Sequence, residues 1–473
     1  MSHPPDWSAG RGRAWGAPAA AFLGRWLDGR GSDAPAAAGY RLQPHPLIDG
    51  LEELVLRSSP QDAANPPPAA GALLLGTVRM GYGHYRFALS LADAARAQGL
   101  RPLWLDLGAL ADPASRLLRR INRLYSGLSR LSADSGGPAD RLWERLTAAG
   151  DWNALRLSVE LAPRFAHLLD GLDRGLVFLS SFAWVGHIAV AAGFERVIHL
   201  VHDNAPMPFV AVPGALNLVQ SPSMYTGLRR LGLPAAALEL AGHWVGQRSA
   251  RSAERLSALR LGRLQRAAPR RLLIPIGGAG SQVELIERIL AHLAPALRAG
   301  RCRLLLNCGD HAPACRRLRG LLERLDLAHR VYTDWPAARD RAAALQLTAT
   351  EPAAPAAVEL FQLDEPLAGV ELTDRLTSAC DLLLSKPSEL AFLPLPKLML
   401  RRVGRHEALG AIRAAELGDG TPECRDWSQT RFFLDALVHG DDLLAQLNAG
   451  VSRAARAGVY DGAIRAVQLA ARG

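Results

Sequence analysis

Short apolar segments alternate with amphipathic segments along most of the chain, and this alternation constrains the fold more than any other feature of the sequence. In the first half, an apolar run over 72–78 is followed by a helical pattern over 85–98 and by a second apolar run over 102–107. In the second half, "RRLLIPIGG", "CRLLLNCG" and "ACDLLLS" are separated by segments with helical spacing, such as "SQVELIERILAHLAPALRAG". Short apolar strands that alternate with helices predict parallel sheets covered by helices on both faces.

Two blocks of this pattern lie on either side of a charged segment, 249–271, that has few strand signals. At 473 residues the chain is longer than one hydrophobic core usually supports. We therefore predict an α/β fold of two doubly wound, Rossmann-like domains that face each other across a cleft. The predicted division is an N-terminal extension with a Pro/Ala-rich linker over 1–70, a first domain over 71–245, a connector over 246–271, a second domain over 272–440 and a C-terminal helical segment over 441–473.

The segment 175–194, "GLVFLSSFAWVGHIAVAAGF", has no charged residue over a length that is sufficient to cross a membrane. However, "LVFLSS" and the "RVIHLVHD" that follows are rich in the branched and aromatic residues typical of strands. Between them, "FAWVGHIAVAAG" has helical spacing and ends at a glycine. We therefore interpret this region as a buried strand, helix and strand rather than as a transmembrane helix.

The net charge of the chain bears on whether its partner is a nucleic acid or an anionic membrane. A formal net charge of +10 is common among proteins that bind nucleic acids or anionic membranes. Only two of the 55 basic residues are lysines, Lys386 and Lys397, and the bias towards Arg, Ala, Gly and Pro is typical of GC-rich coding. Because no RNA-binding or zinc-finger motif is present, we predict no nucleic-acid partner.

The cysteine content points to a cellular compartment. The chain has five cysteines, none of them in a CxxC pair, and no secretory signal precedes the first strand. These features favour a reducing, cytoplasmic location.

The loop "TVRMGYGHYR" joins the first predicted strand to the first predicted helix, where a doubly wound sheet binds its ligand. Gly81 and Gly83 permit a sharp turn that exposes backbone N–H groups at the positive end of the helix dipole. His84 then stands at the start of the helix, where an exposed imidazole that titrates near neutrality can take a proton from a hydroxyl group. The alternative is that His84 is only a residue that begins the helix.

A second glycine-rich loop, "IPIGGAGSQ", occupies the equivalent place in the second block. Gly277, Gly278, Gly280 and Ser281 form a suitable nest for a diphosphate group. The alternative is a tight turn that needs glycine backbone angles. No lysine follows the glycines, so the loop is not the P-loop of nucleotide hydrolases.

A third group of polar residues lies in "DLLLSKPSELAFLPLPKLMLRRVGRHEALGAIRAAELGDG", over 381–420. Glu389 follows the carboxyl end of a strand, where a carboxylate can hold the two hydroxyls of a ribose. His406 and Glu407 begin the next helix. The alternative for Glu389 is a carboxylate that complements the dipole of a helix. For His202, after the strand "RVIHL", a structural histidine bonded to the backbone is the favoured interpretation.

Together, these segments resemble glycosyltransferases of the GT-B fold, in the branch that holds monogalactosyldiacylglycerol synthases and the N-acetylglucosaminyltransferase of peptidoglycan lipid assembly. The resemblance covers about 71–420, in the same order along the chain. "GYGHYRFALSLADAARAQG" is similar to the family's "GGGH" loop and helix, "LLIPIGGAGS" to its donor-phosphate loop, and "RLLLNCGDH" to its "VCGRN" strand. Relative to "LP" at 395–396, Glu389 has the spacing of the family's ribose-binding glutamate, and His406 and Glu407 lie where the family carries "QE" beside the donor sugar.

The resemblance implies a hexosyltransferase that needs neither a metal nor another cofactor. A nucleoside-diphosphate sugar, with UDP as the expected nucleotide, binds the second domain, where the loop over 277–281 stabilises the leaving diphosphate. An acceptor hydroxyl enters from the first domain, next to Gly81 and Gly83. His84 deprotonates or orients that hydroxyl, and Asp203 assists or positions the acceptor.

Three features depart from the family pattern. The family's turn "KxGxxT" is shortened here to "KPSE", His406 replaces a glutamine, and a segment rich in Ala and Pro is inserted over about 339–355. Two other functions therefore remain alternatives. One is a relative of the same fold with other chemistry, such as a nucleotide-sugar epimerase, and the other is a protein that binds a nucleotide sugar for regulation without catalysis.

The family often acts on lipid acceptors, and two segments of the chain suit an anionic membrane surface. "RLLRRINRLYSGLSRL", over 116–131, places leucines and an isoleucine on one helical face and arginines on the others. The stretch over 11–31, with Trp15 and Trp26, is a weaker candidate. These segments predict a peripheral protein at the inner face of the membrane. The alternative for 116–131 is a surface helix packed on its own domain, and the alternative for 11–31 is a poorly ordered extension.

Overall fold

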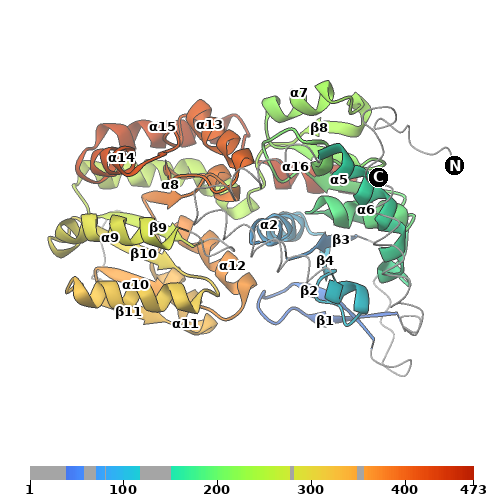
Figure 1. Cartoon of the computed structure of the whole chain (residues 1–473), viewed down its shortest axis with the longest axis horizontal. Coiled ribbons are helices and arrows are strands. Elements are labelled where there is room, and N and C mark those ends of the chain that lie inside the picture. The colour runs from blue at the N-terminus through green and yellow to red at the C-terminus, as the bar shows by residue number, and fades with distance from the viewer. Residues whose placement is uncertain are drawn as a thin grey trace. The chain divides into compact units, whose positions relative to one another are not determined.

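The computed structural model describes residues 39–57, 71–79, 81–117, 151–276, 282–348 and 356–472 (Figure 1). Among these residues, contacts divide the chain into two compact units. The first unit takes the described residues up to 247 together with 461–472, and the second takes 248–460. Along the described residues, the chain passes from the first unit to the second at 247–248 and returns to the first at 460–461.

The first unit contains a sheet of eight described strands in the order β1-β2-β4-β3-β5-β6-β7-β8. The pair β1 and β2 is antiparallel, and every other pair of neighbours is parallel. The strands are β1 (Tyr40–Pro44), β2 (Glu52–Leu56), β3 (Ala72–Thr77), β4 (Arg101–Asp106), β5 (Val177–Ser180), β6 (Val197–Leu200), β7 (Leu216–Val219) and β8 (Leu238–Leu240).

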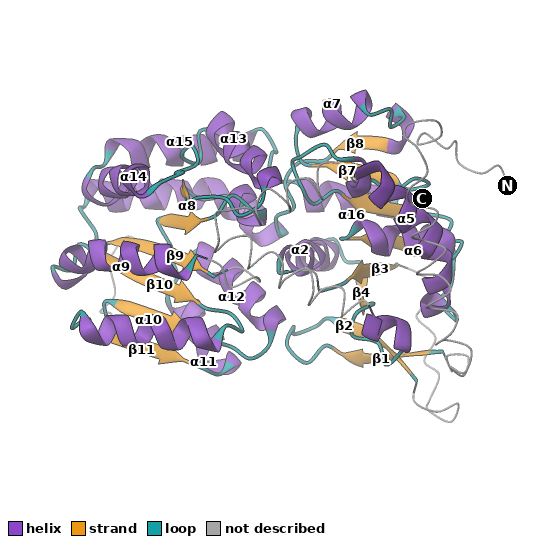
Figure 2. Cartoon of the chain, in the orientation of Figure 1, coloured by secondary structure: helices purple, strands orange, loops and turns teal. Residues whose placement is uncertain are grey.

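Helices lie on both faces of this sheet (Figure 2). They are α2 (Gly83–Ala97), α5 (Asp151–Leu161), α6 (Ala183–Ala191), α7 (Pro222–Arg230) and α16 (Gly462–Ala471), with the 3₁₀ segments η1 (Ala162–Leu169), η2 (Pro208–Val210) and η3 (Ala235–Ala237). Leu74 of β3 packs in one core with Val185 and Ile188 of α6. Its neighbour Leu73 is also buried but lies outside that core, because successive strand residues point to opposite faces. Phe87 of α2 is buried outside that core as well.

The second unit contains an entirely parallel sheet of six described strands in the order β11-β12-β10-β9-β13-β14. The strands are β9 (Arg270–Pro275), β10 (Cys302–Asn307), β11 (His329–Tyr332), β12 (Val358–Phe361), β13 (Leu382–Ser385) and β14 (Lys397–Met399). The helices are α8 (Gln247–Gln265), α9 (Val283–Arg298), α10 (Ala312–Arg324), α11 (Trp335–Ala344), α12 (Pro366–Thr377), α13 (Ala408–Leu417), α14 (Trp427–His439) and α15 (Asp442–Arg456), with the 3₁₀ segments η4 (Glu389–Phe392) and η5 (Arg405–Glu407).

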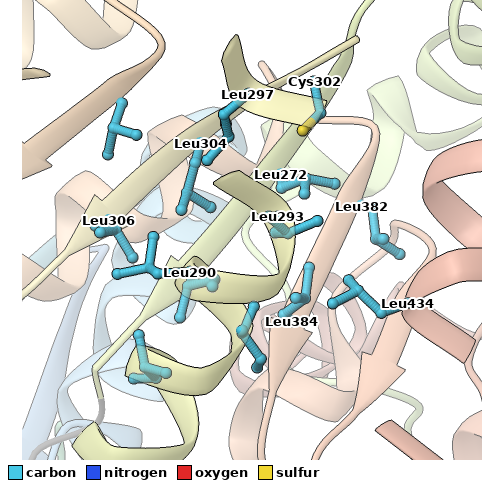
Figure 3. Close-up of a cluster of buried hydrophobic side chains, with 14 of the residues drawn as sticks. Leu272, Leu290, Leu293, Leu297, Cys302, Leu304, Leu306, Leu382, Leu384 and Leu434 are labelled. Atoms are coloured by element: carbon cyan, nitrogen blue, oxygen red, sulfur yellow. The ribbon is translucent and has the colours of Figure 1, made fainter. Parts of the chain in front are cut away.

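Leucines of the central strands, of α9 and of α14 form part of the core on one face of this sheet (Figure 3). The residues are Leu272, Leu304, Leu306, Leu382 and Leu384 from the strands, Leu290, Leu293 and Leu297 from α9, and Leu434 from α14. Each contributes about 1.5–3 kcal/mol when fully buried. Leu273, Leu305 and Leu383 are also buried but lie outside this cluster, so they supply the other face of the sheet.

The predicted α/β fold with two doubly wound parallel sheets is confirmed. The interpretation of 175–194 is also confirmed, because the segment forms β5 and α6 and is followed by β6. Among the described residues, no helix combines the length and apolarity that a bilayer crossing requires. The cleft between the two domains stays a prediction.

Three regions differ from the sequence interpretation in detail. The strands β1 and β2 belong to the first sheet, although the sequence placed 40–56 within an N-terminal extension. The charged connector is largely the helix α8, and the start of the proposed insertion at 339 continues α11. The helix α16 belongs to the first unit, where Arg196 donates to the carbonyl oxygens of Leu469 and Ala470.

Candidate functional site

In the first unit, the strand order reverses at β3: β4 lies on one side of β3, and β5 and the strands after it lie on the other. Ligands of doubly wound sheets bind beyond the carboxyl ends of the strands at such a point. The turn after β3 contains Gly81, whose φ of 85° lies in the left-handed region that favours glycine. Gly83 is the first residue of α2 and has no such requirement.

His84 lies in the first turn of α2, and its ring is held by residues from other segments. Its Nδ1 is 2.8 Å from the carbonyl oxygen of Ser181, which follows β5. Since a carbonyl oxygen can only accept, Nδ1 carries the proton in this pair and Nε2 keeps its lone pair. The ring centroids of Phe182 and His202 lie 4.5 Å and 4.8 Å from that of His84.

The expectation that His84 is an exposed imidazole that titrates near neutrality is wrong. The residue is only 7% exposed. Burial, and to a smaller extent the nearby His202, lower the pKa of His84 to about 3 in spite of the opposing effects of the Ser181 carbonyl and Asp203. His84 is therefore neutral at physiological pH, with Nε2 as its hydrogen-bond acceptor.

His202 and Asp203 follow β6 at the same edge of the sheet. The His202 Nε2 is 3.1 Å from the Asp203 Oδ2, so the carboxylate contacts His202 directly. The side chain of Gln220 donates to the carbonyl oxygen of His202 at 3.0 Å. The structural role that the sequence favoured for His202 therefore omitted its contact with His84. The only signal for that contact was the position of the pair His202–Asp203 at a strand end.

In the second unit, the equivalent reversal lies at β9, between β10 and β13. A pocket opens beyond the carboxyl ends of β9 and β13, next to the first turn of α9. It is lined by Ile274, Pro275, Gln282, Ile286, Leu384, Ser385, Lys386, Ser388, Leu390 and Leu400. Six of these residues are apolar and four are polar.

An ion pair stands at the edge of this pocket. The Lys386 ammonium pairs with the Oε1 of Glu407, while the Oε2 of Glu407 accepts from the backbone N–H groups of Val403 at 2.7 Å and Gly404 at 3.2 Å. Burial opposes ionisation of Glu407. The Lys386 ammonium, the nearby His406 and the Val403 N–H together outweigh burial, so the pKa of Glu407 is lowered. Glu407 is therefore an ionised carboxylate held within the protein.

The other predicted donor residues lie near this pair, but they do not line the described part of the pocket. Glu389 is the first residue of η4, between the pocket residues Ser388 and Leu390. His406 is in η5, and its ring lies so close to Gly404 that a Cβ on that glycine would be 2.5 Å from the imidazole Cε1.

Several predicted residues lie outside the described part of the chain. These are Gly277, Gly278, Gly280 and Ser281 of the glycine-rich loop, nearly all of the amphipathic segment over 116–131, and the stretch over 11–31. Their predicted roles stay predictions. Gln282, immediately after the glycine-rich loop, has a φ of 70° and donates to the carbonyl oxygen of Arg401.

The structure thus brings His84, His202 and Asp203 together in the first unit, and Lys386 and Glu407 together in the second. Sequence reasoning did not assign Lys386, although it is one of only two lysines in the chain. No group of three or more metal-ligating side chains occurs within the described ranges.

Two family descriptions match the chain. Residues 233–471 match the family described as domain of unknown function DUF6938, and residues 45–230 match domain of unknown function DUF6937. No curated protein matches the chain.

Solved structures of similar fold have low sequence identity to the chain. The Anabaena HepE protein in complex with UDP is 15% identical, with 84% of this chain and 97% of that chain covered and a TM-score of 0.40. The UDP-GlcNAc 2-epimerase of Neisseria meningitidis bound to UDP-GlcNAc is 11% identical, with 82% and 98% covered and a TM-score of 0.43. A glycosyltransferase from Rickettsia africae is 11% identical, with 84% and 97% covered and a TM-score of 0.40.

Proposed function

We propose a nucleotide-sugar transferase function for this chain, which belongs to the family described as domain of unknown function DUF6938. The observation that carries the proposal is that each sheet has polar residues at its own reversal point. His84 lies beyond β3 in the first unit, and the pocket with Lys386 lies beyond β9 and β13 in the second. A reaction between a nucleotide sugar and an acceptor needs one binding region for each.

In this proposal, the second unit binds the nucleoside diphosphate, and the first unit supplies the base. The protonated Nδ1 of His84 is bonded to Ser181, which leaves Nε2 to accept a proton from a hydroxyl group. Asp203 acts through His202, which it contacts at 3.1 Å. By the family resemblance, Glu389 has the position of the residue that binds the ribose, and His406 has that of a residue beside the donor sugar.

The resemblance further favours UDP as the nucleotide, a hexose as the transferred sugar and a lipid hydroxyl as the acceptor. By the same resemblance, we propose that the reaction takes place at the inner face of the membrane and requires no metal ion. These finer points extend the proposal and depend on the resemblance alone.

Binding without catalysis is the second candidate function. The observation that favours it is the burial of His84, whose pKa of about 3 makes it a weaker base than a solvent-exposed imidazole. This candidate predicts that the protein binds a nucleotide sugar but does not consume it.

The test combines binding with product analysis. Thermal unfolding is followed with UDP, GDP and dTDP sugars, and any bound nucleotide that remains after purification is identified by mass spectrometry. The transferase proposal predicts stabilisation by one nucleotide and release of the nucleoside diphosphate when an acceptor is present. No stabilisation by any of them refutes both candidates. If the configuration at one carbon of the sugar changes when no acceptor is present, the protein is an epimerase instead.

A pair of variants then tests the base. His84→Ala is expected to leave nucleotide binding unchanged and to lower transfer by about a hundredfold or more. His187→Leu is the matched control, because His187 is also buried but lies on α6 without contact to the His84 ring. Equal turnover in His84→Ala and in the control refutes the role of His84.

A further inference from the structure

We propose that Lys386 is the cation that binds phosphate in the second unit, and that Glu407 is a positioning residue that holds the Lys386 ammonium until an anionic ligand takes it. The inference rests on the proposed function, because it says how that site would hold a nucleoside diphosphate. It also gives Glu407 a role that differs from the sugar contact that the resemblance implies.

Both carboxylate oxygens of Glu407 are bonded to other groups of the protein. Its Oε1 pairs with Lys386, and its Oε2 accepts from two backbone N–H groups, those of Val403 and Gly404. The side chain is also only 6% exposed. A buried carboxylate with both oxygens already bonded is not presented to a sugar hydroxyl, so its contribution to binding is exerted through Lys386.

Lys386 lies where a ligand in the pocket can reach its ammonium group. It follows the last residue of β13, lines the pocket and is 21% exposed, so its ammonium is accessible to a ligand. Among the described residues that line the pocket, Lys386 is the only one with a charged side chain. The other polar residues of the pocket are uncharged, so Lys386 is the counter-charge that a diphosphate bound at these residues would meet, in competition with Glu407.

The ion pair has a consequence for affinity. In the unliganded protein, the carboxylate of Glu407 neutralises most of the Lys386 charge, and a phosphate must compete with it. Removing the charge of Glu407 should therefore strengthen the binding of a diphosphate. Removing the charge of Lys386 should weaken it. A direct contact between Glu407 and the ligand predicts weaker binding in both cases.

The rarity of lysine supplies a selective probe. The chain has two lysines, and Lys397 is completely buried and paired with Asp419 at 2.8 Å. Reductive methylation with ¹³C-formaldehyde therefore labels Lys386 and the α-amino group, and it preserves the positive charge of both. The Lys386→Arg variant identifies the Lys386 resonance by its disappearance.

The labelled protein is titrated with UDP and, separately, with inorganic pyrophosphate, and both ligands are expected to move the Lys386 resonance. In unlabelled protein, calorimetry is expected to show UDP binding about tenfold weaker in Lys386→Gln. In Glu407→Gln it should be about fivefold tighter. Arg402→Gln is the matched control. Arg402 lies on the same loop as Glu407, and the variant breaks a comparable ion pair, the one between Arg402 and Glu423 at 3.3 Å. Arg402 is not among the residues that line the pocket.

The outcomes separate this inference from the proposed function. If UDP binds without moving the Lys386 resonance, the inference fails and the proposed function stands. If pyrophosphate moves the resonance but no nucleotide binds, the inference stands and the proposed function fails. If neither ligand moves it, the inference fails. Weaker binding in Glu407→Gln refutes the positioning role, and if that variant does not fold, the titration of the wild-type protein decides the role of Lys386.

Discussion

The buried histidines of the first unit predict that this unit loses stability in mild acid. Burial lowers the pKa of His84 and His199 to about 3 and that of His187 to about 4, from an ordinary value of 6.5. His202 faces both His84 and His199, and Asp203 faces His84. Below pH 6.5 the unfolded chain takes up protons at these three histidines, while the folded unit does not do so until about pH 4, so the free energy of unfolding falls with pH in this window.

The size of the loss follows from the shifts. At pH 5.5, protonation of an ordinary histidine stabilises the unfolded chain by about 1.4 kcal/mol relative to pH 7.5, which gives about 4 kcal/mol for three histidines. His167 opposes this loss. The Asp112 carboxylate, whose Oδ1 lies 3.6 Å from the His167 Nε2, raises the pKa of His167, so the contact adds stability below pH 6.5 and this stability is lost as the pH rises. Because the His167 side chain is 48% exposed, solvent screening makes its contribution small.

The assay is hydrogen exchange followed by mass spectrometry at pH 7.5 and 5.5, with correction for the intrinsic exchange rate at each pH. Peptides from β5 and β6 should lose about 4 kcal/mol of opening free energy, and peptides from β9 and β10 should lose less. His187→Leu should reduce the loss in the first unit by about a third. An equal loss in both units, or no difference between His187→Leu and the wild type, refutes the reasoning.

Two further substitutions test the packing of the units. Lys397→Met should destabilise the second unit by about 3–5 kcal/mol in denaturant unfolding, because it leaves the Asp419 carboxyl buried without its counter-charge, with the hydroxyl of Tyr460 at 2.7 Å. The double variant Lys397→Met with Asp419→Asn should recover part of the loss, and a double variant no more stable than the single one contradicts this account. Gly76→Ala should destabilise the first unit by about 1–3 kcal/mol, because the new Cβ would lie 2.3 Å from a ring carbon of Phe178. Unchanged melting of that variant would mean that β3 and β5 have room to move apart.

Local periodicity determined the class of the fold. The strand expected over 72–78 is β3, the helix expected over 85–98 is α2, and the strand expected over 102–107 is β4. Apolar runs and helical spacing are properties of neighbouring residues, so they are visible without knowledge of the partner elements. The turn at Gly81 was predictable for the same reason, since its positive φ is a local requirement.

Membership of a sheet or unit was less visible where the contact is remote. The hairpin β1–β2 joins the first sheet through β4, about 50 residues further along the chain. The helix α16 docks on the first unit after the chain has completed the second. Neither segment carries a pattern that specifies its partner. An apolar face indicates that the segment is buried, but it does not indicate which other element packs against it.

The candidate site shows the same division most clearly. The sequence by itself determined that His84 follows a glycine turn at a strand end and that Glu389 and Glu407 follow the strands of the second block. Only the tertiary structure decided their chemical state. His84 is neutral because Ser181, Phe182 and His202 bury its ring, and these residues come from segments about 100 residues away. Burial and ionisation depend on neighbours in space, whereas a sequence pattern records only neighbours along the chain.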